Sequence, residues 1–255
     1  NLAARIDAAR TATGLDDAAR AKLIDTWTQA RDRLTDAERS KAKTEEFEAA
    51  RLAAPDLLAE LRGQLARPEP NLDLRAAPTA TLDDLEAALA TADTYARTQR
   101  EQLASLEAEA RRRNERRAAI PQLTADRKRE LEDVTNLLSR AERSGDGTPQ
   151  AEANRALLAA QRQALEQEIA SYAAELASYE ARGELMTARR DISARQVAEA
   201  DKLEHAWQAL VEDRRRGDVD AAARAAREAI PAAAALHPVL GELAGSNAEL
   251  ATQRV

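Results

Sequence analysis

An arginine-rich segment holds the residues whose types and spacing most directly suggest chemistry. Residues 111–117 read Arg-Arg-Arg-Asn-Glu-Arg-Arg, so five arginines fall within seven positions. Clustered cations attract anionic partners, and the segment is therefore a candidate contact for a phosphate, a lipid headgroup or a nucleic acid. The arginines of this candidate anionic contact are Arg111, Arg112, Arg113, Arg116 and Arg117.

A second interpretation of the same segment stays open. Cations near the end of an expected helix are favourable against the helix dipole even when their side chains contact only solvent. No aromatic residue is interleaved with these arginines, so the bases of a nucleic acid would have no side chain on which to stack. A further basic run, Arg214–Arg216, lies at the expected end of another helix.

Candidate catalytic and metal-binding groups are few. His205 and His237 have no second metal ligand at helical spacing, and we interpret both as surface or seam residues. The pairs Asp16-Asp17 and Asp83-Asp84 stand where helices are expected to begin, so capping and the helix dipole account for them. The chain has no cysteine, which excludes a disulfide or a thiolate metal site. We expect no enzyme activity, no cofactor and no metal.

The composition indicates long helices rather than a rounded α/β core. Of 255 residues 62 are alanine, aromatic residues make up 2%, and there are only eight glycines and eight prolines. Sheets favour β-branched and aromatic residues, and 33% charged residues with abundant alanine are typical of coiled coils. The net charge of −7 argues against a dedicated nucleic-acid module. No stretch approaches the roughly 20 apolar residues that cross a bilayer.

Prolines and glycines divide the chain into four expected segments. These are an N-terminal helical segment at 1–66, a proline-rich linker at 67–80, a long coiled-coil hairpin at 81–216 and short C-terminal helices at 217–255. Thr81 followed by acidic residues predicts a helix start, and residues 144–149 predict a turn.

Further helix breaks are expected at four prolines and one glycine. A proline disfavours helical backbone in the residue before it, so we expect breaks at Ala54-Pro55 and at Pro121, and flanking prolines at 231 and 238 around one last turn. Gly217 is expected to end the long helix that begins near residue 150.

Two heptad seams determine the expected architecture. Apolar residues step by three and four through the first seam, which consists of Leu82, Leu85, Leu89, Ala92, Ala96, Gln99, Leu103, Leu106 and Ala110. The second seam consists of Leu158, Leu165, Ile169, Tyr172, Leu176, Tyr179, Gly183 and Met186. We interpret the two tyrosines as core residues and Trp27 and Trp207 as packing anchors.

The predicted fold is all-α. It consists of elongated antiparallel helical hairpins, or a coiled-coil bundle, with one very long helix over about 150–216. The N- and C-terminal segments are expected to pack against the second half of that helix. Because short turns favour closure within one chain, we expect the isolated domain to be monomeric.

Several stretches, in order and spacing, resemble a known family. They are Ala54-Pro55-Asp56-Leu57-Leu58-Ala59-Glu60-Leu61-Arg62, Thr81-Leu82-Asp83-Asp84-Leu85-Glu86, Leu165-Glu166-Gln167-Glu168-Ile169, Glu184-Leu185-Met186-Thr187-Ala188-Arg189-Arg190-Asp191, and His237-Pro238 followed by Asn247-Ala248-Glu249-Leu250. Over nearly the whole chain the sequence resembles the extracytoplasmic N-terminal region, or "porin" domain, of MscK-type, MscS-like mechanosensitive ion channels.

The resemblance implies a function. It implies a non-catalytic periplasmic domain of an inner-membrane channel that opens under tension and protects against osmotic downshock. Its partners would be the membrane channel portion of the same polypeptide, together with cell-envelope components or neighbouring subunits, and no nucleic acid. The chain begins at Asn1 without a signal peptide, so we expect an excised piece of a longer polypeptide.

Two alternatives stay open on composition alone. One is a cytosolic coiled-coil scaffold, and the other is a periplasmic adaptor hairpin of an export system. Adaptor hairpins usually interrupt a β-rich domain, and no strand-like half is visible in this sequence.

Overall fold

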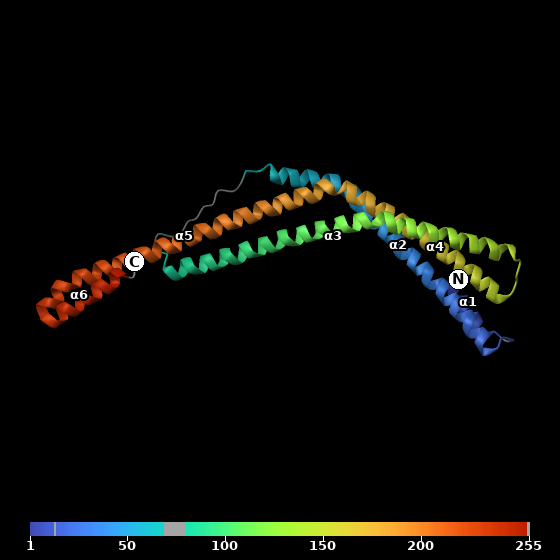
Figure 1. Ribbon diagram of the computed structural model, residues 1–255, viewed down its shortest axis with the longest axis horizontal. Helices are drawn as coiled ribbons and strands as arrows, with labels where there is room; N and C mark the ends of the chain where they lie inside the picture. Colours follow the sequence, from blue (N-terminus) through green and yellow to red (C-terminus); the bar gives the residue numbers. More distant parts are fainter. Residues whose placement is uncertain (13, 69–79, 254–255) are drawn as a thin grey trace. The chain divides into compact units, whose positions relative to one another are not determined.

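The computed structural model describes residues 1–12, 14–68 and 80–253, and nearly all of these are helical (Figure 1). The helices are α1 (Leu2–Thr11), α2 (Asp17–Leu65), α3 (Leu82–Arg143), α4 (Pro149–Ala181), α5 (Gly183–Leu236) and α6 (Pro238–Gln253). No described residue lies in a strand, and the all-α prediction is confirmed. None of these helices is both long and apolar enough to span a bilayer.

Three helices continue through residues that we expected to break them. Pro55 lies inside α2, Pro121 inside α3 and Pro231 inside α5, and α5 also runs through Gly217. The breaks predicted at these positions were therefore wrong. A proline removes one backbone hydrogen bond and clashes with the preceding turn, at about 3 kcal/mol. The many bonds of a helix of 49 to 62 residues outweigh that loss, and Ile120 beside Pro121 is anchored by burial, with 2% of its surface exposed.

The prediction of one helix over about 150–216 was also wrong. α4 ends at Ala181 and α5 begins at Gly183, so the break falls on Arg182, whose backbone angles are φ −95° and ψ 5°. Backbone hydrogen bonds still bridge it, because Arg182 N–H donates to the Ser178 carbonyl and Met186 N–H to the Arg182 carbonyl, both at 3.0 Å. At its other end α5 extends well past residue 216, to Leu236.

Local signals placed the start of α3 and the turn between α3 and α4 correctly. Asp84 N–H donates to the Thr81 hydroxyl at 3.2 Å, and Thr81 N–H donates back to the Asp84 carboxylate at 2.9 Å. This reciprocal cap confirms the predicted helix start, and the hydrogen bonds from Thr81 lower the pKa of Asp84. Gly145, with φ +64°, turns the chain from α3 into α4. Most of the expected linker, residues 69–79, lies outside the described residues.

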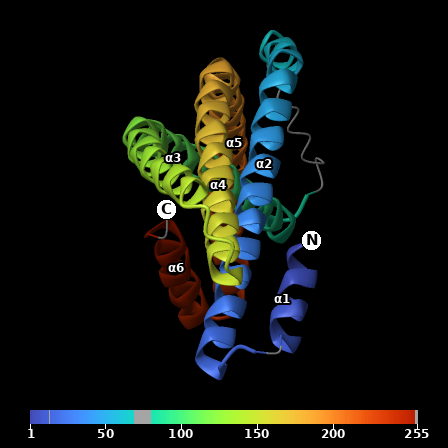
Figure 2. The same cartoon turned by 90° about the vertical axis from the view of Figure 1, so that its right-hand side faces the viewer.

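The chain divides into two compact units, each made of two segments, and the four expected segments stay a prediction. Unit 1 comprises residues 1–64 and 107–189. Within it α4 lies between α2 and α3, and α1 packs beside α2 (Figure 2). Trp27 is a packing anchor, as predicted, in a core with Ile6, Ala9, Leu23 and Ala153. The first part of the N-terminal segment thus packs on the beginning of α4, whereas its end contacts the second half of the predicted long helix, where Arg62 pairs with Glu184 at 2.8 Å.

Unit 2 comprises residues 65–106 and 190–255. It confirms the first seam, since Leu85, Ala92, Ala96 and Gln99 are all buried on α3. Ala200 on α5 is fully buried too, as expected where alanine lets two helices approach closely. Arg100 of α3 pairs with Asp201 at 2.8 Å and with Glu204 at 2.7 Å on α5. Trp207 is half-buried on the same helix.

Small residues mediate the packing of α6 on α5. A Cβ atom added to Gly241 would lie 2.9 Å from the Cβ atom of Ala234 on α5, whereas one added to Gly245 would meet no atom within 4 Å. Ala248 is buried on α6. The larger apolar side chains of this region are exposed; they are Leu236, Val239, Leu240, Leu243 and Leu250.

Two glycine substitutions test this packing. Replacing a helical glycine by alanine gains up to about 1 kcal/mol of helix propensity, so we expect Gly245→Ala to raise the melting temperature. Gly241→Ala makes the same gain but collides with Ala234, and we expect faster amide hydrogen exchange in α6. Equal protection of α6 in both variants would contradict the close approach.

Candidate functional site

A short motif occurs twice on α4, seven residues apart. Residues 168–172 read Glu-Ile-Ala-Ser-Tyr and residues 175–179 read Glu-Leu-Ala-Ser-Tyr. Glutamate and tyrosine four positions apart share one face of a helix. The Tyr172 hydroxyl donates to the Glu168 carboxylate at 2.6 Å, and the Tyr179 hydroxyl to the Glu175 carboxylate at 2.8 Å. Each repeat therefore presents a carboxylate that a tyrosine already orients.

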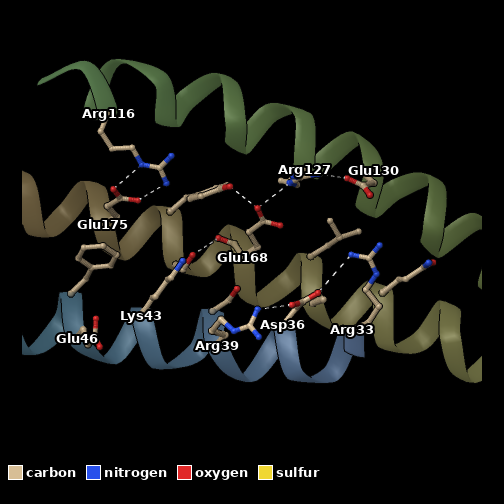
Figure 3. Close-up of a pocket in the computed structure, with 17 residues that line it drawn as sticks. Arg33, Asp36, Arg39, Lys43, Glu46, Arg116, Arg127, Glu130, Glu168 and Glu175 are labelled. Atoms are coloured by element: carbon tan, nitrogen blue, oxygen red, sulfur yellow. Dashed lines mark hydrogen bonds and ion pairs between the residues drawn. The ribbon is translucent and has the colours of Figure 1, made fainter. Parts of the chain in front are cut away.

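α3 supplies an arginine to each carboxylate (Figure 3). Arg116 donates to Glu175 through Nε and Nη2, both at 2.9 Å. Arg127 donates through Nε to Glu168 at 3.1 Å and through Nη1 to Glu130 of its own helix at 2.6 Å. The Arg116 guanidinium also lies 5.3 Å from the centroid of the Tyr172 ring, a cation–π distance.

These contacts form a continuous polar layer between α3 and α4. We call it the Arg–Glu–Tyr layer, and it consists of Arg116, Arg127, Glu168, Tyr172, Glu175 and Tyr179. Its central carboxylate is deeply placed, because only 7% of the Glu175 side chain is exposed. Charge-assisted, bidentate hydrogen bonds of this kind are strong and geometrically specific.

The arginines and tyrosines of the layer keep their protons near neutral pH. The hydrogen bond to Glu175 raises the pKa of Arg116, and that to Glu130 is the main cause of the raised pKa of Arg127. Burial, followed by the hydrogen bond to a carboxylate, raises the pKa of Tyr172 and of Tyr179. Neither tyrosine loses its proton near neutral pH, so the layer is suited to holding two helices together and not to proton transfer.

A cleft of about 560 Å³ opens beside the layer, between α2, α3 and α4 (Figure 3). Its α2 wall carries Arg33, Asp36, Arg39, Lys43 and Glu46. Asp36 pairs along its own helix, with Arg39 at 3.0 Å and Arg33 at 3.8 Å. Of the described residues that line the cleft, none on α2 forms an ion pair with one on α3 or α4. α2 therefore lies against the layer without being bonded to it through charge.

The structure divides the five predicted arginines between two environments. Arg116 is in the layer, Arg117 pairs with Glu180 at 3.6 Å, and Arg113 lies over the Tyr179 ring at 4.8 Å. Arg111 and Arg112 are exposed. All five lie inside α3, which ends only at Arg143, so their interpretation as a solvated helix end was wrong. Their contact with an anionic surface stays a prediction.

The partners of these arginines were missed in the sequence. The sequence patterns considered above assign no role to Glu168, Glu175 or Arg127, and they place Tyr172 and Tyr179 in the second seam as core residues. The repeated Glu-X-Ala-Ser-Tyr motif is the signal that would have found them, because it places two identical polar pairs one heptad apart. Tyr172 is buried, as its core interpretation requires.

The histidines lie where the sequence suggested. His205 is exposed, with Nδ1 2.6 Å from the Asp201 carbonyl oxygen. His237 separates α5 from α6 and accepts a hydrogen bond from Val239 N–H at 3.2 Å. Within the described part of the chain, no group of three or more histidine, aspartate or glutamate side chains could hold a metal ion.

Comparison with known proteins identifies one family. A family model described as the mechanosensitive ion channel porin domain matches residues 5–242. No curated protein and no solved structure matches the chain.

The tyrosines of the layer predict an alkaline loss of stability. An unfolded tyrosine ionises near pH 10, whereas folded Tyr172 and Tyr179 hold their protons to higher pH. The free energy of unfolding should therefore be insensitive to these groups below about pH 9 and fall as the pH rises through about 10. Urea unfolding across this range should show a smaller fall for the Tyr172→Phe/Tyr179→Phe double variant.

The exposed Tyr95 offers a matched control for this experiment. Tyr95→Phe should keep the full alkaline loss of the wild type. An equal loss in the double variant would contradict the assignment to Tyr172 and Tyr179.

Proposed function

The chain belongs to the mechanosensitive ion channel porin domain family, and from that premise we propose that it is a periplasmic, non-catalytic domain that transmits force to a tension-gated channel in the inner membrane. The family is one of channel domains and not a class of enzymes. Its description favours the channel role over a cytosolic scaffold or an adaptor hairpin of an export system. The proposed physiological role is protection during osmotic downshock.

The observation that carries the proposal is the Arg–Glu–Tyr layer. Alanine-rich helix contacts tolerate sliding, because one small apolar side chain replaces another as the helices shift. The bidentate contact of Arg116 with Glu175 does not tolerate sliding, since its two hydrogen bonds require one relative position of α3 and α4. A load applied to one helix of this pair is thus passed to the other instead of being lost in slippage.

The proposed partners follow from this role. The first is the membrane channel portion of the same polypeptide, which would receive the load. Cell-envelope components or neighbouring subunits would supply the opposing attachment, because a load-bearing element needs to be held at two places. No nucleic acid is proposed as a partner.

Patch-clamp recording on the full channel tests the role. We expect deletion of residues 1–255 to change the tension at which the channel opens and to lower survival of downshock. Glu175→Gln, which weakens the contact with Arg116, should shift the threshold in the same direction by a smaller amount. Asp93→Asn removes an exposed pair with Arg97 on α3 and should leave the threshold unchanged.

Two readouts keep this test decisive. Native electrophoresis of each variant shows whether the channel still assembles. The location of the domain is tested with an introduced cysteine, because the chain has no cysteine of its own. Gly147→Cys in the exposed turn before α4 meets no atom within 4 Å, so a membrane-impermeant maleimide should label it from the periplasmic side. An assembled deletion channel with unchanged threshold and downshock survival would overturn the force-transmitting role, and labelling only from the cytoplasm would overturn the periplasmic location.

A further inference from the structure

The outer face of α6 carries a row of exposed residues with heptad spacing. α6 doubles back along the end of α5 (Figure 1), and its inner face is the one on which Gly241 approaches Ala234 and Ala248 is buried. On the opposite face, four residues step by three, four and three positions. We call this row the α6 stripe, which consists of Leu240, Leu243, Asn247 and Leu250.

The leucines of the α6 stripe are exposed to an unusual degree. Leu240, Leu243 and Leu250 are 44%, 60% and 58% exposed, and Val239 beside them is 60% exposed. Apolar side chains gain free energy when they leave water. Single exposed leucines are ordinary, whereas a continuous apolar patch on one helix face marks an interaction surface.

The pattern of the stripe indicates what covers it. In heptad notation Leu243 and Leu250 take position d, and Leu240 and Asn247 take position a. Leucine at d with a single asparagine at a is typical of parallel two-stranded coiled coils, in which the asparagine fixes the register and the number of strands. An apolar partner would bury the Asn247 amide without a hydrogen bond, which is unfavourable. A second copy instead brings an identical amide to the same level, because a two-fold axis places each residue opposite its own counterpart.

The charges of α6 are compatible with a second copy and unsuited to a membrane surface. Glu242 and Glu249 are the charged residues of α6, and both take position c, away from the stripe. The positions that flank the stripe on either side are uncharged; they are Val239, Ala244, Ser246 and Ala251. Two paired α6 helices would therefore place no like charges opposite each other. A helix that lies on a membrane surface is rich in lysine and arginine on its polar face, and α6 has neither.

The area of the stripe is sufficient for a weak dimer. Together with Val239, the three leucines expose the equivalent of about two whole leucines in each copy. Pairing would bury roughly 800 Å² of apolar surface, and about 1,000 Å² with Asn247 and the flanking residues, which is near the lower limit for a specific interface. Association through α6 should therefore depend on protein concentration.

We propose that two copies of the chain pair through the α6 stripe as a parallel two-stranded coiled coil. This inference goes beyond the proposed force-transmitting role and does not depend on it. It also qualifies the expected monomer, because short turns close helix contacts within one chain but leave the outer face of α6 open. The chain is then a monomer at low concentration and a dimer at high concentration.

Sedimentation equilibrium over a wide range of concentrations tests the pairing. We expect the wild type to show a monomer–dimer equilibrium, and Leu243→Lys to weaken it at least tenfold, because the variant loses a buried leucine at the centre of the interface. Leu52→Lys is the matched control, since Leu52 is 72% exposed on α2 and lies outside the stripe. It should associate as the wild type does.

The asparagine gives a readout that a merely apolar patch would lack. Asn247→Leu removes the polar residue from position a, so the variant should associate more tightly and form oligomers larger than a dimer. Association that is unchanged in Asn247→Leu would place this amide outside the interface and contradict the proposed register.

Disulfide cross-linking tests the parallel orientation, because the chain has no cysteine of its own. In a parallel pair each d residue meets its own counterpart, so Leu250→Cys should form a disulfide-linked dimer under mild oxidation. Glu249→Cys is the control at the neighbouring position c and should cross-link far less. Equal cross-linking at the two positions would contradict the parallel pair.

Two results of the sedimentation experiment would overturn the pairing. One is a wild type that stays monomeric at every concentration, and its retention by vesicles of phosphatidylglycerol and phosphatidylcholine would then assign the stripe to a membrane surface. The other is an equal effect of Leu243→Lys and Leu52→Lys, which would place any dimer contact elsewhere. Both substitutions replace exposed residues, so the variants should fold, and their far-UV circular dichroism checks this.

Discussion

Arg116 and Glu175 lie 59 positions apart in the chain, and their two-pronged contact is the interaction on which the packing of α3 against α4 depends. Alanine at seam positions brings helices close but does not specify how far one has shifted along the other. A buried carboxylate does specify it. If α3 slipped by one heptad, Glu175 would lose its arginine while staying buried, and an unpaired buried charge costs several kcal/mol. The layer therefore stabilises one register of α3 against α4 over other registers whose apolar contacts would be similar.

The layer complements the apolar packing of unit 1, in which the buried positions of α4 are mostly small or polar. Its core at the N-terminal end is small, built on Trp27 and the residues around it, and most other buried positions on α4 are alanine, serine or the polar residues of the layer. Tyrosine is suited to this setting, because its ring packs against Arg113 and Arg116 while its hydroxyl orients a glutamate. Polar contacts of fixed geometry thus help to fix the relative position of the helices, as interlocking apolar side chains do in other helical bundles. This same rigidity is what the proposed force-transmitting role requires.

Much of the fold could be predicted from the sequence because its signals are local. The cap at Thr81, the turn at Gly145 and the seam of α3 from Leu82 onward each depend on residues within one or two turns. The breaks predicted at Pro55 and Pro121 were wrong, because the low helix propensity of one proline was weighed without the many backbone hydrogen bonds of the long helix around it.

The second seam describes only part of the packing of α4. α4 packs on α2 and on α3 at once, and buries residues on two faces, such as fully buried Ser178, which the single stripe of Leu158 to Met186 does not contain. The roles of the arginines could not be predicted either, because no local rule states which glutamate will lie opposite Arg116. Only the repeated Glu-X-Ala-Ser-Tyr motif gave a hint of it.

A double-mutant cycle on Arg116 and Glu175 tests most directly whether this contact holds α3 against α4. The free energies of unfolding of Arg116→Gln, Glu175→Gln and the double variant are compared with the wild type in urea. Our account predicts a coupling of about 1.5–3 kcal/mol, well above the roughly 0.3–0.5 kcal/mol expected for the exposed pair of Arg97 and Asp93. Additive effects, with a coupling no larger than that of the exposed pair, would contradict it.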